Sequence, residues 1–386
     1  MLPQKLRSSA FVSFLILATI LNVATAGAQQ GGTDIAAEHA RHLRHGINAS
    51  MWFAQAPRNY SKERLQTYTT PDDIALIAHM GFDHVRLSID ADPLVEWQRA
   101  HGNTTAFMTE LDRVVNTVLG NHLAVIIDIH PESSYKTPLR QGTNSVQNFT
   151  ALWRALAAHF ASSDPEYVFF EIMNEPEQDD PYRWQGIQSV VADAIRAVAP
   201  RHTIIVGGAH WSGLEDLLVL EPLGQSNIIY TFHDYEPFPF THQGATWTSP
   251  EVQPLRAIPY PSSTEVVSPK LEQEPDLAGK YFLEQYGLGR WDADRVEKTI
   301  EFAARWSQLH HAPVYCGEFG VLRDYAPPAM RAQWLHDMRA AMEKNNIGWA
   351  MWDYQANFGV VTKANGVTTP DPAIVNALGL HAPENR

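Results

Sequence analysis

The sequence alternates short apolar runs rich in β-formers with longer segments whose apolar residues recur at helical spacing. This alternation is typical of a parallel sheet whose strands are connected by helices. Eight such strand–helix units predict an α/β fold, a closed (β/α)8 or TIM barrel in a single domain. The predicted strands are His45–Ala49, His84–Ile89, Ala124–Ile129, Val168–Met173, Thr203–Val206, Ile228–Phe232, Pro313–Tyr315 and Gly348–Trp352.

Cap and stop residues mark the helices between these strands. The segment Thr70–Asp73 offers an N-cap residue, a proline at the first helical position and two acids at the positive end of the helix dipole. This helix should run to about Met80 and stop at Gly81. Helical spacing predicts further helices at residues 107–119, Val146–Phe160, Tyr182–Val198, Leu214–Leu220, Asp292–Leu309 and Pro328–Lys344.

One connection is much longer than the others. Residues Glu236 to Arg290, between the sixth and seventh predicted strands, are rich in proline and aromatic residues. Long connections in compact domains are usually functional or disordered, and the aromatic content favours an ordered excursion that helps to form a cleft. Because no repeat or linker marks a second domain, residues 41–386 are predicted to form one barrel domain.

The N-terminal segment is typical of a secretory signal peptide. A short basic start precedes an apolar run from Phe11 to Val23, and small residues follow at positions 24–28. The apolar run is shorter than the roughly 20 residues that a membrane-spanning helix needs. We therefore expect residues 1–26 to be removed, residues 27–40 to form a mobile leader, and the mature chain to be secreted or periplasmic without membrane attachment.

Composition limits the class of partner. The chain has 386 residues, 45% of them hydrophobic, and a formal net charge of −14. An acidic chain without a basic cluster is a poor partner for nucleic acid or anionic membranes and suits an uncharged substrate. The single cysteine, Cys316, can form no intrachain disulfide, and its apolar setting predicts a buried structural residue. We expect a monomer.

Two glutamates stand where apolar strands end. Glu175 follows the fourth predicted strand, and Glu318 follows the seventh. A carboxylate in such a setting costs free energy unless partners or chemistry compensate it. In a (β/α)8 barrel the carboxyl ends of all strands meet at one rim, so residues distant in sequence become neighbours there. The other polar or aromatic candidates at strand ends are Arg86, Asp128, His130, Asn174, His233, Tyr235 and Trp352.

These residue types suit the cleavage of glycosidic bonds. That reaction needs a protonated acid for the leaving oxygen and a carboxylate that attacks the anomeric carbon or directs water to it. Arg86 and Tyr235 can donate hydrogen bonds to Glu318 and keep it anionic, Asn174 can bond a sugar hydroxyl, and Trp352 offers a flat face for a pyranose ring. The residues alone leave open which glutamate is the acid.

Other interpretations compete with this one. Asp128 and His130, with His233 and His210, could be ligands of a metal in a metal-dependent barrel hydrolase. A carbohydrate-binding barrel without catalysis would keep the aromatic rim but would not need both carboxylates. Glu171 shares the inward side of its strand with Glu175, and we expect it to form an ion pair with an arginine of a neighbouring strand.

The ordered set of motifs resembles glycoside hydrolase family 5, the cellulase family. The motifs are Arg86 in Val85–Leu87, His130 in Asp128–His130, Asn174–Pro176, His233–Tyr235, Gly317–Gly320 and Trp352. Their order and spacing agree over about residues 42–360. The resemblance implies that Glu175 is the acid/base and Glu318 the nucleophile of a retaining double displacement.

The resemblance also implies roles for the surrounding residues, and it implies no metal or organic cofactor. Asn174 would bind the 2-hydroxyl, and Arg86 and Tyr235 would hold Glu318. His233 and His130 would order the acid/base and the subsite, and Trp352 would form the sugar platform.

The expected substrate is a β-glucan. We predict an endo-β-1,4-glucanase acting on cellulose-like or mixed-linkage glucans, with β-mannanase or β-1,3-type glucanase as the alternative. Trp211 and Trp247, both near the predicted rim, are either further sugar platforms or packing residues. The residues after His130 and the long excursion depart from common family patterns. The sequence therefore leaves open whether the substrate is a glucan or a mannan, and whether cleavage is internal (endo) or from a chain end (exo).

Overall fold

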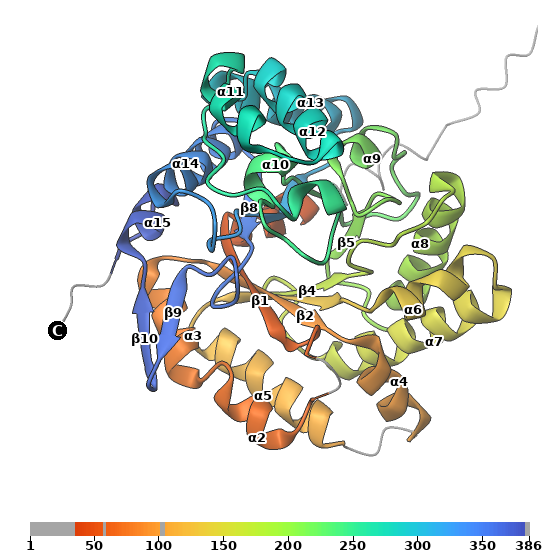
Figure 1. Ribbon diagram of the computed structural model, residues 1–386. Coiled ribbons are helices and arrows are strands. Elements are labelled where there is room, and N and C mark those ends of the chain that lie inside the picture. The colour runs from red at the N-terminus through yellow and green to blue at the C-terminus, as the bar shows by residue number, and fades with distance from the viewer. Residues whose placement is uncertain (1–34, 57–58, 101–104, 383–386) are drawn as a thin grey trace, which may run out of the picture.

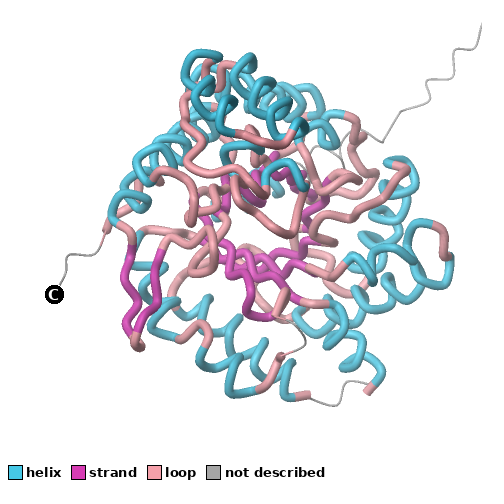
Figure 2. Tube along the Cα trace, viewed as in Figure 1, coloured by secondary structure: helices cyan, strands magenta, loops and turns pink. Residues whose placement is uncertain are grey.

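The computed structural model describes residues 35–56, 59–100 and 105–382. Eight parallel strands form one closed barrel in the order β1 to β8, which confirms the predicted (β/α)8 architecture. Figures 1 and 2 show the strands as a central ring surrounded by helices. The strands are β1 (His45–Phe53), β2 (His84–Ile89), β3 (Ala124–Ile129), β4 (Val168–Glu171), β5 (Ile204–Gly207), β6 (Ile228–His233), β7 (Val314–Phe319) and β8 (Gly348–Met351).

Helices cover the outside of the barrel, and several short elements lie in the connections between them. The helices outside the long excursion are α2 (Lys62–Thr67), α3 (Pro71–Met80), α4 (Ala91–Arg99), α5 (Ala106–Gly120), α6 (Ser133–Lys136), α7 (Thr143–Phe160), α8 (Pro181–Arg196), α9 (Leu214–Leu218), α13 (Ala293–His310), α14 (Pro328–Lys344) and α15 (Pro372–Ala377). The remaining short elements are the 3-10 turns η1 (Ala40–His42) and η2 (Thr137–Arg140) and the hairpin β9 (Val361–Ala364) and β10 (Val367–Pro370).

The start and stop signals of α3 act as predicted. The Thr70 hydroxyl accepts from the Asp73 amide, and the Asp73 carboxylate accepts from the Thr70 amide at 2.7 Å, which completes a capping box. Gly81 follows the helix with φ of 98°, a left-handed conformation that is strained for residues with a Cβ. The predicted bounds of β2, β3 and α14 also coincide with the observed ones.

Other strand ends differ from the prediction. β1 runs four residues beyond Ala49, and β7 runs to Phe319 with all six of its residues buried. Both extensions include buried polar residues, since Ser50 of β1 and Glu318 of β7 are each 4% exposed. β4 instead ends at Glu171, two residues before its predicted end.

The long excursion between β6 and β7 is ordered, as predicted, but it contains helices that the sequence did not predict. These are α10 (Phe238–Thr241), η3 (Pro250–Val252), α11 (Thr264–Gln273) and α12 (Leu277–Gly289), seen beside α13 in Figure 1. Pro269 lies inside α11 and Gly279 inside α12, and such residues disfavour helix when a sequence is read alone. The fold overrides that local preference.

Hydrogen bonds fasten the excursion to the barrel. The Trp334 indole donates to the Glu236 carbonyl at 3.3 Å, and the Tyr260 hydroxyl donates to Asp337 at 2.8 Å. Tyr260 is buried, with 1% of its surface exposed. The excursion is therefore a fixed wall beside the barrel mouth.

The amino-terminal end of the barrel is closed by a separate apolar cluster. Residues 35–39 form a helix, and Ala36 and Leu43 pack beneath the strands together with Phe169 and Ile205. The His39 imidazole lies 2.7 Å from the Thr203 hydroxyl, which ties this helix to the chain just before β5. Residues 35–40 are thus ordered and packed, which corrects the expected mobile leader for that part of residues 27–40.

The rest of the expected leader and the predicted signal peptide lie outside the described residues. Within the described part of the chain, every helix is too short or too polar to cross a membrane.

Replacement of Phe169 tests how much this apolar cluster contributes to the stability of the fold. The Phe169 side chain is fully buried beneath the barrel. We expect Phe169→Ala to lower the free energy of unfolding by about 3–5 kcal/mol, because the lost ring leaves a cavity among rigid strands. Urea unfolding followed by circular dichroism measures the change. The matched control is Phe302→Ala on α13, where the ring is 50% exposed and the cost should stay within about 0.5 kcal/mol.

Candidate active site

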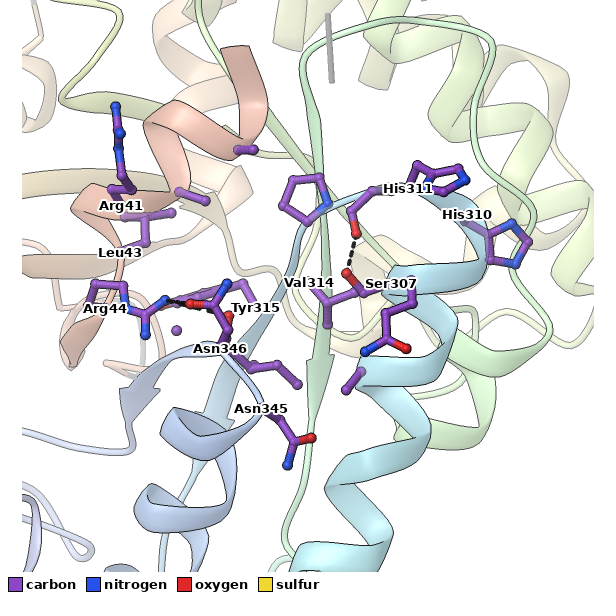
Figure 3. Close-up of a pocket in the computed structure, with 18 residues that line it drawn as sticks. Arg41, Leu43, Arg44, Ser307, His310, His311, Val314, Tyr315, Asn345 and Asn346 are labelled. Atoms are coloured by element: carbon purple, nitrogen blue, oxygen red, sulfur yellow. Dashed lines mark hydrogen bonds between the residues drawn. The ribbon is translucent and has the colours of Figure 1, made fainter. Parts of the chain in front are cut away.

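Two cavities lie at opposite ends of the barrel. The larger, about 1050 Å³, is at the amino-terminal ends of the strands, where Val314 begins β7 and Gly348 begins β8. Figure 3 shows Arg44 and Asn346 on one side of it and Ser307 and His311 on the other. Functional sites of (β/α)8 barrels lie at the other end, so we assign this cavity no role in the reaction.

The smaller cavity, about 430 Å³, lies at the carboxyl ends of the strands. The barrel brings together residues of seven of its eight strands, or of the turns directly after them, in its wall or directly behind it. The predicted site residues in the wall are His130, Asn174, Glu175, Tyr235, Glu318 and Trp352. Arg86 and His233 lie behind this wall, where they contact the two glutamates.

Glu318 is held by two donors, one on each carboxylate oxygen. The Arg86 Nη1 donates to Oε1 at 2.7 Å, and the Tyr235 hydroxyl donates to Oε2 at 2.8 Å. Arg86 is fully buried in β2, and Glu318 near the end of β7 is 4% exposed. A hydrogen bond from a guanidinium to a carboxylate is charge-assisted, so it is shorter and stronger than a bond between neutral groups.

Arg86 organises three further residues beneath the cavity. Its Nε and Nη2 donate to both oxygens of Glu171 at 2.8 and 2.7 Å, so Glu171 forms the predicted ion pair. Contrary to the prediction, the arginine does not come from a neighbouring strand, because β3 separates β2 from β4. Nη2 also lies 3.1 Å from Asp128, and Nη1 donates to Asn48 at 3.0 Å. Burial raises the pKa of Glu171, and it raises that of Asp128 to about 6 although Arg86 opposes the shift.

Glu175 has a different environment. It lies in the turn after β4 with φ of 43°, and its side chain is 25% exposed at the cavity wall. Its Oε1 lies 3.0 Å from His233 Nδ1. Partial enclosure raises the pKa of its carboxyl group, which favours the protonated acid. The site therefore contains one glutamate paired with a buried cation and one that holds a proton more readily.

Two buried histidines connect these groups. Burial lowers the pKa of His233 to about 4 and that of His130 to about 3, so both are neutral near pH 7. His130 Nδ1 lies 3.0 Å from Asp128, which assigns the proton to Nδ1 and leaves Nε2 to accept from the Asn174 amide at 3.1 Å. The Asn174 carbonyl then faces Arg86 at 3.0 Å. This chain of bonds fixes the orientation of Asn174.

The aromatic candidates differ in position. Trp352, just after β8, stacks on His130 with ring centroids 5.7 Å apart and 20° between the planes. Trp247, 58% exposed, reaches the cavity from the long excursion and meets Phe358 at 6.5 Å. Trp211 is 62% exposed and is not part of the cavity wall. The structure thus brings Trp352 and Trp247 to the site but leaves Trp211 at its periphery.

Several wall residues were not predicted. Gln55 follows β1, His242 comes from the excursion, and Asn357 and Phe358 follow β8. The position of Gln55 after a barrel strand could have been found if β1 had been predicted at its true length. The others lie in connections without regular spacing, so no sequence signal marked them.

One group of side chains at the cavity could in principle bind a metal ion. The ligand atoms of Glu175, His233 and Glu318 lie within 4.8 Å of one another, the one such group of possible ligands in the described residues. The expected set was different: His210 instead bonds Asp216 at 2.8 Å, and Asp128 faces Arg86. Arg86 already supplies a positive charge 2.7 Å from Glu318. The trio fits a pair of acids with a positioning histidine.

A closed (β/α)8 barrel whose mouth holds two glutamates in contrasting environments, beside an aromatic platform, defines a glycoside hydrolase. The comparison with known families agrees: the model described as cellulase, glycosyl hydrolase family 5, matches residues 48–358. The chain belongs to that family.

Several curated relatives are enzymes named endoglucanases. Endoglucanase C of Acetivibrio thermocellus is 29% identical over 80% of this chain and 90% of its own length. Endoglucanase 3 of Fibrobacter succinogenes is 28% identical over 86% of this chain, and the match spans 53% of that relative, about half of it.

Solved structures show the same fold. Endoglucanase Cel5A from the hyperthermophilic Thermotoga maritima is 28% identical with a TM-score of 0.71, and the match covers 89% of this chain and 99% of that one. Structures of Cel5A exist in complex with cellobiose and with mannotriose.

Proposed function

We propose that the protein is a retaining endo-β-1,4-glucanase. The observation that carries the mechanism is the proximity of the two glutamates, whose nearest carboxylate oxygens lie within 4.8 Å of each other. Retaining glycosidases have carboxyl groups about 5–5.5 Å apart, whereas inverting ones need roughly 6.5–9.5 Å to admit a water between them. The spacing here suits direct attack by a carboxylate.

In the proposed first step, a Glu318 oxygen attacks the anomeric carbon while Glu175 gives its proton to the leaving glycosidic oxygen. The carbon–oxygen bond to the leaving sugar breaks, and a glycosyl ester on Glu318 forms. In the second step Glu175, now a carboxylate, takes a proton from water. The resulting hydroxide attacks the same carbon and releases Glu318, so the anomeric configuration is retained.

The neighbours of the glutamates support this division of roles. Arg86 and Tyr235 donate to Glu318 and stabilise the carboxylate that attacks and later leaves. His233 is neutral and its Nδ1–H donates to Glu175, which orients that side chain without supplying a full positive charge. His130 and Arg86 hold Asn174 in one orientation, which supports the proposal that its amide bonds the 2-hydroxyl of the reacting sugar.

The proposed substrate is a cellulose-like or mixed-linkage β-glucan. The names of the curated relatives and the cellobiose complex of Cel5A support glucan, and Trp352 provides a platform for a pyranose ring. Mannan is the second candidate because Cel5A, 26% identical in that structure, was also solved with mannotriose. We further propose that the protein is secreted by means of residues 1–26.

A panel of polysaccharides tests the proposal. We expect reducing-sugar release from carboxymethyl cellulose and barley β-glucan to exceed release from galactomannan and laminarin by at least about tenfold, a ratio within the reach of subsite contacts. A rapid fall in viscosity would mark internal cleavage. Proton NMR of the first products should show the β-anomer, because two inversions restore the configuration. Activity confined to mannan would refute the glucanase assignment, and an α-anomer would refute the retaining mechanism.

A further inference from the structure

A buried ion pair outside the proposed reaction lies beside Glu175. The ammonium of Lys136, at the end of α6, is 3.1 Å from Oε1 of Glu177, and the Ser133 hydroxyl donates to the same oxygen at 2.8 Å. The Lys136 side chain is 5% exposed and that of Glu177 is 15% exposed. Burial of a lysine is costly unless its charge is compensated, so this pair calls for an explanation.

The pair is fastened to the turn that carries Glu175. Glu177 comes two residues later, and both glutamates have positive φ, 43° and 55°, on either side of Pro176. The Gln178 side-chain amide donates to the Pro176 carbonyl at 2.9 Å and to the Lys136 carbonyl at 3.3 Å. Main-chain and side-chain bonds thus connect the segment after β3 to the segment after β4, with the Glu175 turn between them.

The charges around Glu175 give the pair an electrostatic consequence. Burial raises the pKa of Glu175, Lys136 is the strongest opposing influence, and Glu177 adds to the increase. Arg86 is also near, but it is engaged with Glu171, Asp128 and Glu318. The titratable and charged groups that face Glu175 from the elements around it are His233 of β6, Tyr235, Glu318 of β7, Arg86 of β2, Asp128 and His130 at the end of β3, and the Lys136–Glu177 pair.

We propose that the Lys136–Glu177 pair holds the Glu175 turn in place and sets the pH range over which Glu175 can donate its proton. Both members are positioning residues. The inference rests on the proposed role of Glu175 as proton donor. The two charges of the pair act on Glu175 in opposite directions, with Lys136 the stronger, so removal of either one exposes the effect of the other.

The pair can be tested by replacing each member in turn, because the two replacements should move the basic limb of the kcat/KM profile in opposite directions. Lys136→Met removes a positive charge, so the protonated form of Glu175 persists to higher pH and the basic limb of kcat/KM should move up by about half a unit or more. Glu177→Gln removes a negative charge, so that limb should move down. In the double variant the basic limb should lie between those of the two single variants, with a smaller upward shift than in Lys136→Met because Lys136 acts on Glu175 more strongly than Glu177 does.

Lys136→Arg is the matched control, since it keeps the charge and should keep the position of the basic limb. Thermal melting of every variant separates misfolding from a change in titration. Shifts in the same direction, or an unmoved basic limb in both single variants, would overturn the inference. Its failure is distinct from failure of the proposed function: the latter would appear as an active Glu175→Ala variant, whatever the pair does.

Discussion

Replacement of Glu318 by glutamine is expected to lower kcat on soluble β-glucan by roughly 10⁴-fold or more, the scale seen when a nucleophile is removed. An amide has no negative charge with which to attack the anomeric carbon. Its carbonyl oxygen can still accept from Arg86, whose Nη1 lies 2.7 Å from the present Oε1, so the fold should persist. Initial rates on barley β-glucan, with thermal melting as a check of the fold, measure the effect.

Glu132→Gln is the matched control for that variant. Glu132 is another acid near the barrel mouth, but it is exposed and lies outside the cavity wall. Its replacement should change kcat less than about twofold. If Glu318→Gln retained more than a tenth of wild-type activity on a natural glucan, the proposed nucleophile would be wrong.

Glu175→Ala is expected to show the second largest loss, roughly 10³-fold on a glucan, which is the range of general acid catalysis. The loss should be much smaller for an aryl cellobioside with a good leaving group, because that bond breaks without protonation. The deficit should then lie in the second step, where water lacks a base. Steady-state kinetics on both substrates, with a pre-steady-state burst on the aryl glycoside, measure this difference.

Azide distinguishes the two glutamates. In Glu175→Ala the small anion can enter the space beside His233 and attack the glycosyl ester, so activity on the aryl glycoside should rise and a β-glycosyl azide should form. In Glu318→Ala the anion attacks the anomeric carbon of the substrate itself and gives the α-glycosyl azide. A β-azide from the Glu318 variant, or none from the Glu175 variant, would contradict the assigned roles.

Local signals account for the parts of the fold that were predicted well. The capping box of Thr70 and Asp73 and the left-handed Gly81 fix the ends of α3 through bonds within a few residues. The bounds of β2 and β3 coincide with their predictions because β2 alternates polar with apolar residues and β3 is an almost continuous apolar run, and every residue of both strands is buried. The predicted ion pair of Glu171 follows from strand alternation in the same way.

Elements that depend on distant contacts were missed. α11 and α12 contain residues unfavourable in helices, and they pack against each other, with Val267 of α11 and Leu283 of α12 buried. The β9–β10 hairpin is held by Lys363 and Thr368, which bond Asp73 of α3 at 2.5 and 2.9 Å, a contact no local pattern reveals. The order of residues 35–40 likewise comes from burial beneath the strands.

The sequence by itself determined the barrel, the rim and the identity of its polar residues, because strand and helix periodicity and the parallel arrangement place every strand end on one side. Only the tertiary structure decided how these residues differ. Glu175 and Glu318 are the same residue type in similar apolar runs, yet one meets a buried guanidinium and a phenol while the other meets a neutral histidine near Lys136. Burial and charge at a carboxylate depend on atoms brought from distant strands, so local sequence does not contain them.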